Sequence, residues 1–131
     1  MAYTIGHIIG KLLRADITLK GLTGGTTPDY KIYMDFPYKK DIAPSLVSFK
    51  FIGSLRPSEL RQDRFLAVTL WGDNYEAMGN AVYSILHLTS PATADERILL
   101  IKFINSGAEL WDDGLQCYYR QDQYQIILAK E

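Results

Sequence analysis

The stretch "AVTLWGDNYEAMGNAVYSIL", residues 67–86, changes its apolar rhythm in the middle. In its first half nearly every position is apolar, which is typical of a strand covered on both faces. After Asn74 the apolar residues recur at helical spacing, which predicts a helix over about 75–86. Asp73 as N-cap, with Glu76 three residues later, forms an acidic version of a capping box. We therefore interpret "WGDN" as a structural strand-to-helix corner; the alternative is a loop that presents Asp73 and Asn74 to a ligand.

Alternation of apolar and polar residues predicts strands on both sides of this corner. The expected strands are "YKIYMDF" (30–36), "SLVSFKFIGS" (45–54), "RFLAVTLW" (64–71), "RILLIKFINSGAELW" (97–111) and "LQCYYRQDQYQIILAK" (115–130). An amphipathic helix over 4–15 precedes them, followed by a glycine-rich loop over 21–30. The "DDG" before the last strand signals a hairpin turn.

These elements predict one α+β domain over residues 1–131, in the order α-β-β-β-α-β-β. Two helices would pack on one face of a mostly antiparallel sheet of four to five strands, because both apolar stripes need a partner. The other face of the sheet is then left uncovered. On it we place Tyr33, Ser48, Lys50, Trp71, and Tyr118 or Tyr119.

Catalytic, cofactor and metal sites are not expected. Cys117 lies in an apolar strand and has no partner cysteine, which favours a small buried hydrophobe over a nucleophile. His7 and His87 lack a metal-ligand pattern, and the dipole at the end of a helix accounts for His87. Asp112 and Asp113 are neighbours that point apart, so a general acid–base pair is not expected. No signal peptide or membrane-spanning run is expected either.

Charge is nearly balanced in total but not along the chain. The net charge of −1 gives no reason to expect nucleic-acid binding. Residues 1–64 hold ten Lys or Arg against six Asp or Glu, whereas residues 65–131 hold four against nine. The two halves either mix in one sheet and average out, or give the subunit a basic and an acidic side suited to head-to-tail association.

Aromatic residues exceed what a small core needs, with nine Tyr, five Phe and two Trp. Tyr and Trp are enriched at protein interfaces, which favours an assembly subunit. We expect contacts with neighbouring subunits or other proteins at the segment "PYKKDIAP", at a loop projecting over 55–64, and at the last hairpin. The candidate residues are Tyr38, Lys39, Lys40, Asp41, Arg56, Glu59, Arg61, Arg64, Trp111, Asp112 and Asp113.

The order of motifs over residues 4–90 resembles the tail-terminator, or tail-completion, proteins of long-tailed bacteriophages and related phage-like particles. The motifs are "ITLKGLTGG", "KIYMDFP", "APSLVSFKFIGS", "WGDNYEAM" and "AVYSIL". The resemblance implies a non-enzymatic virion protein without cofactors, located at the junction of tail and neck and assembled in the host cytoplasm.

Its implied partners are other copies of itself in a ring, usually a hexamer, the tail-tube protein, and a head-completion or neck protein. The ring would end the polymerisation of the tail tube, and DNA would only pass through its lumen. The alternatives are another head–tail connector or, from a different class, a small ligand-binding domain or enzyme that uses the uncovered sheet face.

Overall fold

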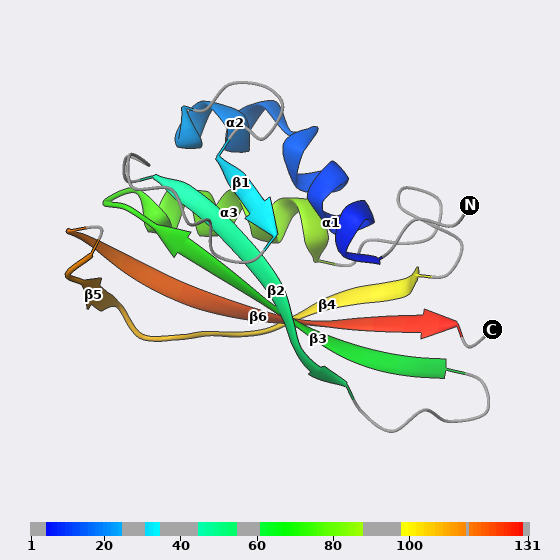
Figure 1. The fold of residues 1–131 in the computed structure, drawn as a ribbon. Coiled ribbons are helices and arrows are strands. Elements are labelled where there is room, and N and C mark those ends of the chain that lie inside the picture. Colours follow the sequence, from blue (N-terminus) through cyan, green and yellow to red (C-terminus); the bar gives the residue numbers. More distant parts are fainter. Residues whose placement is uncertain are drawn as a thin grey trace.

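One six-stranded sheet carries three helices on one face, in the residues that the computed structural model describes (5–24, 31–34, 45–54, 61–87, 98–114 and 116–129; Figure 1). The elements in chain order are α1 (Ile5–Arg14), α2 (Ile17–Thr23), β1 (Ile32–Met34), β2 (Leu46–Ser54), β3 (Arg61–Trp71), α3 (Tyr75–Leu86), β4 (Ile98–Ser106), β5 (Leu110–Asp112) and β6 (Cys117–Ala129). This confirms the α+β class.

The long strands β3 and β6 form the centre of the sheet. The strand order is β1-β2-β3-β6-β4, and β5 also pairs with β6. All of these pairs are antiparallel except β1 with β2, which is parallel and short. As a result, β1 lies at one edge of the sheet, and β4 and β5 lie at the opposite edge.

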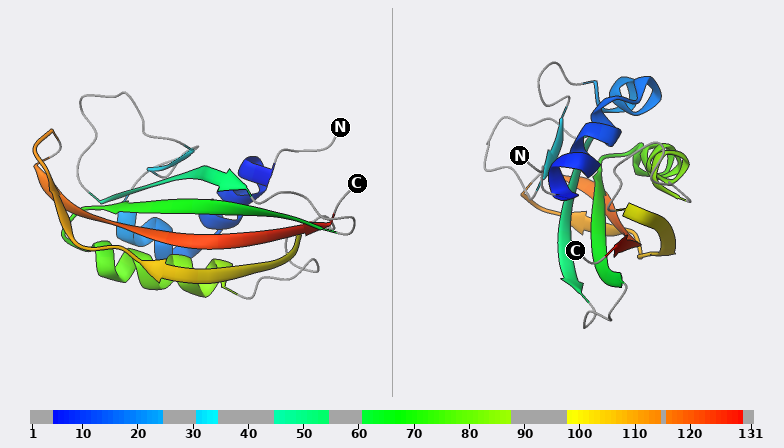
Figure 2. Two further views of the ribbon diagram at one scale, coloured as in Figure 1. Left: turned by 90° about the horizontal axis from the view of Figure 1, so that it is seen from below. Right: turned by 90° about the vertical axis from the view of Figure 1, so that its right-hand side faces the viewer.

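The core lies between the helices and the sheet, as the two further views in Figure 2 show. Alternate residues of each central strand point toward the helices and are almost fully buried. They include Val47 and Phe49 of β2, Leu66, Val68 and Leu70 of β3, and Tyr124, Ile126 and Leu128 of β6. The helices contribute Ile9 and Leu13, Leu19, and Met78, Val82 and Leu86. Burial of each such aliphatic side chain stabilises the fold by roughly 1.5–3 kcal/mol.

The N-terminal helical region consists of two helices instead of the one that spacing predicts. Asp16 ends the first and caps the second, because its carboxylate accepts a hydrogen bond from the Leu19 amide (2.8 Å). The second helix ends at Gly24 in the left-handed conformation (φ 69°), so residues 21–23 of the expected loop are helical. The prediction of two helices was therefore wrong by one.

The strands also differ from the predictions in number and in bounds. Six strands form where four or five were expected, because the segment 97–111 divides into β4 and β5. Strand β3 begins at Arg61 rather than at residue 64, so the expected projecting loop over 55–64 was wrong in its last four residues. Residues 55–60 lie outside the described part. The alternation of β6 and the bounds of α3 agree with the sequence-based expectation.

Candidate interaction surfaces

The "WGDN" corner joins three parts of the fold through Asn74. Its amide Nδ2 donates to the Leu22 carbonyl at the end of α2 (2.9 Å). Its Oδ1 accepts from the Ser45 hydroxyl just before β2 (2.9 Å). Gly72 has a φ of 125° and packs so closely that a Cβ there would lie 2.5 Å from the Ser45 backbone nitrogen. The corner is therefore part of the scaffold, as expected.

The N-cap position of helix α3 is not the one that the sequence pattern selects. Helix α3 has Asn74 at its N-cap position, and its side chain makes no capping hydrogen bond. Asp73 is exposed in the turn before it. The predicted capping box of Asp73 and Glu76 was wrong, since Asn74 is recruited by the tertiary contacts with α2 and β2 instead.

The sheet face opposite the helices carries polar and aromatic side chains at its middle. The Trp71 indole Nε1 donates to the Ser48 hydroxyl (3.1 Å), and its ring stacks on Tyr119 with 4.6 Å between centroids. The register pairs Tyr33 with Ser48 and thereby places it on this face as well. Lys50 is exposed beside them. The expected face is therefore confirmed, with Tyr119 rather than Tyr118 as its member from β6.

A shallow hollow of about 210 Å³ lies on this face. It is lined by Ser48, Phe49, Lys50, Ala67, Thr69, Trp71, Tyr119 and Gln121. Small-molecule sites usually occupy roughly 300–1,000 Å³, so the hollow is small for a cofactor or a substrate of ordinary size.

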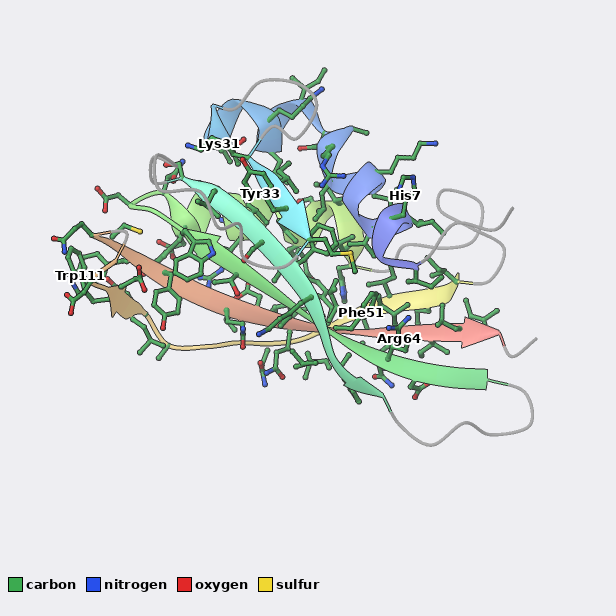
Figure 3. The ribbon with its side chains drawn as sticks, viewed as in Figure 1. His7, Lys31, Tyr33, Phe51, Arg64 and Trp111 are labelled. Atoms are coloured by element: carbon green, nitrogen blue, oxygen red, sulfur yellow. The ribbon has the colours of Figure 1, made fainter. Side chains whose placement is uncertain are left out.

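The hairpin of β5 and β6 exposes a group of large apolar side chains. Trp111 and Tyr118 face each other across the two strands, edge to face, with 4.8 Å between ring centroids. Both are nearly half exposed, as is Leu110. Figure 3 shows Trp111 at one end of the molecule, far from His7 of α1. The sequence predicted Trp111 as an interface candidate but missed Tyr118, which the pairing of β5 with β6 places beside Trp111 on the same face of the hairpin.

Carboxylates surround this apolar group. Asp113 accepts a hydrogen bond from the Trp111 indole (2.9 Å), and Glu109 accepts one from the Tyr75 hydroxyl (3.0 Å). The hydrogen bond to Glu109 raises the pKa of Tyr75. Asp112 is half-buried at the end of β5, so the two aspartates that the sequence singled out lie at the tip of an exposed hairpin.

Of the remaining interface candidates, Arg64 is the one whose side chain is described. The Arg64 guanidinium stacks over the Phe51 ring at 3.8 Å, which ties β3 to β2 (Figure 3). Arg61 is the first residue of β3. Tyr38, Lys39, Lys40, Asp41, Arg56 and Glu59 lie outside the described residues, so their assignment stays a prediction.

A buried ion pair under α3 escaped the sequence analysis. Arg120 binds the Asp122 carboxylate through Nε (2.9 Å) and Nη2 (3.1 Å), and Asp122 is only 2% exposed. Both residues stand in β6 on the helix-facing side, in line with the buried Tyr124. Two polar residues at that position of an otherwise apolar stripe are the signal that could have revealed the pair.

The described cysteine and the histidine after α3, Cys117 and His87, both lie in contacts that belong to the fold. Cys117 is buried, and burial together with the carboxylates of Asp112 and Asp73 raises the pKa of its thiol. His87 accepts a hydrogen bond from the Phe103 amide through Nδ1 (3.1 Å) and stacks on Tyr83. Within the described part of the chain, no three His, Cys, Asp or Glu side chains group as a metal site requires. None of the described helices is long and apolar enough to cross a membrane.

Comparison with solved structures finds the same fold in a particle of viral type. A chain of the structure described as "Virion of native gene transfer agent (GTA) particle" matches with a TM-score of 0.73 at 14% sequence identity. The match covers 96% of this chain and 95% of that chain. The two chains share a fold. No family model matches the sequence, and no curated protein matches it.

Proposed function

We propose that this chain is a structural subunit of a phage-like virion, and more specifically a tail terminator that forms a ring, usually of six copies, on the end of the tail tube. The observation that carries the proposal is the shared fold, which extends over nearly the whole of both chains and leaves no large part of either unmatched. The motif order over residues 4–90 resembles the tail-terminator proteins independently of that comparison.

The surfaces of the subunit support a role in assembly. The aromatic pair of Trp111 and Tyr118 on the last hairpin is nearly half exposed rather than packed in the core. Exposed aromatic groups of this kind are typical of protein–protein contacts. A ring subunit needs contacts with its neighbours and with the tube, and none of these contacts requires a catalytic residue.

No enzymatic activity is proposed for the chain. Its proposed partners are the tail-tube protein on one side and a head-completion or neck protein on the other. Two alternatives remain distinct from it. Another head–tail connector would form a ring that binds the neck but does not stop tube growth. A ligand-binding domain or enzyme would use the hollow beside Trp71 and Tyr119.

Tube growth tests the proposal directly. Purified tail-tube protein of the same virion is allowed to polymerise with and without this chain, and tube lengths are measured by negative-stain electron microscopy. A terminator shortens the tubes as its ratio to tube protein rises and adds a visible cap at one end. Tubes of unchanged length, with no cap at any ratio, would contradict it.

A further inference from the structure

Two separate surfaces of the subunit carry opposite charge. The first is the acidic hairpin, residues 109–113 with 117–118, which holds Glu109, Asp112 and Asp113 and no Lys or Arg. The second is the basic helical surface of α1, α2 and β1, which holds Lys11, Arg14, Lys20 and Lys31 against the single acid Asp16.

The arrangement of these surfaces follows from the topology. Strand β5 lies beyond β6 at one edge of the sheet, whereas β1 forms the other edge and contacts α1. Figure 1 shows α1 and α2 above the sheet and β5 at the left-hand end of the sheet. The two surfaces therefore do not neutralise each other within one subunit. A contact between two different surfaces of identical subunits repeats in one direction and closes into a ring when the rotation permits.

Each surface also has an exposed apolar residue to bury. Ile17 at the start of α2 is 82% exposed, the highest value among the large hydrophobic residues that the structure describes. It lies one turn from Lys20 and Gly21, and a Cβ at Gly21 would meet nothing within 4 Å. A bulky side chain from another molecule has room above this turn. On the hairpin, Trp111 and Tyr118 share one face and are 48% and 43% exposed.

We infer that the acidic hairpin of one copy docks on the basic helical surface of a second copy, and brings Trp111 onto Ile17 between the opposite charges. This inference rests on the proposed function, since it specifies the contact between neighbouring subunits of the ring. The partner is a second copy because the chain itself supplies both halves of a complementary pair.

Charge reversal tests the contact with two double variants. Glu109→Lys with Asp113→Lys reverses the hairpin, and Lys11→Glu with Lys20→Glu reverses the helices. Each reversal alone places like charges at the contact and is expected to raise the dissociation constant at least about 100-fold. The matched control for the helix reversal is Lys50→Glu with Lys102→Glu, the same charge change at exposed residues of β2 and β4, which should leave assembly unchanged.

Mixing the two reversed proteins is the decisive step. The reversed hairpin matches the reversed helices, so two proteins that are each monomeric should form a ring with equal numbers of both, alternating around it. Native mass spectrometry measures this composition, and circular dichroism confirms that each variant is folded. A mixture that stays monomeric, or a single reversal that assembles like the unmodified chain, would overturn the inference.

Cross-linking provides a second test that does not depend on charge reversal. Ile17→Cys with Trp111→Cys should form intersubunit disulfides in the ring and give a ladder of covalent oligomers on a non-reducing gel. Either single cysteine variant should not, because Cys117 is buried. A double variant that forms rings without the ladder would place the subunit contact elsewhere and leave the terminator proposal intact. Absence of rings and of tube capping in the unmodified chain would refute both.

Discussion

Substitution of Asn74 by alanine tests whether the "WGDN" corner is held by this residue or by its neighbour. The Asn74 side chain makes two hydrogen bonds of 2.9 Å, one to the Leu22 carbonyl and one from the Ser45 hydroxyl. In Asn74→Ala, the Leu22 carbonyl loses its hydrogen-bond donor and the Ser45 hydroxyl loses its acceptor. Asp73 is exposed, and alanine at that position removes neither bond.

The magnitude follows from the number of bonds lost. Each hydrogen bond contributes about 0.5–1.5 kcal/mol net, so Asn74→Ala should lower the free energy of unfolding by roughly 2 kcal/mol. An unfolding entropy of about 2.1 cal/mol/K per residue over 131 residues converts this to a fall in Tm of about 7 °C. Asp73→Ala should cost less than about 0.5 kcal/mol, as is usual for an exposed site.

Urea unfolding at one fixed subunit concentration measures both variants, with the fluorescence of Trp71 and Trp111 as the signal. The concentration must be fixed because assembly adds to the apparent stability. If Asp73→Ala costs 1 kcal/mol or more and Asn74→Ala costs almost nothing, the capping box would be the true anchor and the reasoning above would be refuted.

Three further predictions concern the buried layer between β6 and α3. Gly79→Ala should destabilise the fold by about 1 kcal/mol or more, although alanine favours helices, because the new Cβ would meet Arg120 Nη2 and lie 2.9 Å from Leu70 Cδ1. Thermal unfolding measures the loss, and Asn80→Ala is the exposed control. Asp122→Asn should cost about 3 kcal/mol in urea unfolding, since it leaves the charge of Arg120 without its partner; a loss under 1 kcal/mol would contradict this. Tyr124→Phe should raise stability by about 1 kcal/mol, because the buried hydroxyl has no hydrogen-bond partner in the described residues. Burial also raises the pKa of Tyr124 above 10.0, so the folded state holds this proton more tightly and the unmodified chain loses stability as pH rises above 10. The phenylalanine variant should lose less, and equal alkaline slopes in urea unfolding would contradict the assignment.

The sequence predicts best those elements whose pattern depends on local spacing. Helix α3 has the expected bounds because its apolar residues repeat at helical spacing over three turns. The uncovered face of Ser48, Lys50 and Trp71 also follows from alternation along β2 and β3, since a strand must send alternate residues to opposite faces.

What the sequence did not predict depends on contacts between distant segments. The parallel pairing of β1 with β2 is fixed by the path of the chain and has no signature in either strand. Asp73 and Asn74 are both good capping residues, and the positions of Ser45 and Leu22 decide between them. The break between α1 and α2, by contrast, has a local signal. Asp16 is a typical residue for the start of a helix, but the continuous apolar spacing concealed it.

The acidic hairpin was predicted only in part. The "DDG" turn and the exposed Trp111 followed from the sequence, and the structure confirms a hairpin between Asp112 and Cys117. The pair of Trp111 and Tyr118 required the register of β5 on β6. The basic surface required the packing of α1 on β1, the strand at the edge of the sheet opposite β5.

The mass of the protein in solution tests the central claim, a ring-forming virion subunit, most directly. Light scattering coupled to size exclusion is measured over a range of concentrations, alone and with tail-tube protein, and the same fractions are imaged in negative stain. The account predicts closed rings with about six times the 14.9 kDa mass of the chain, alone or on the tube end. A 14.9 kDa monomer at every concentration, which also fails to bind the tube protein, would contradict it.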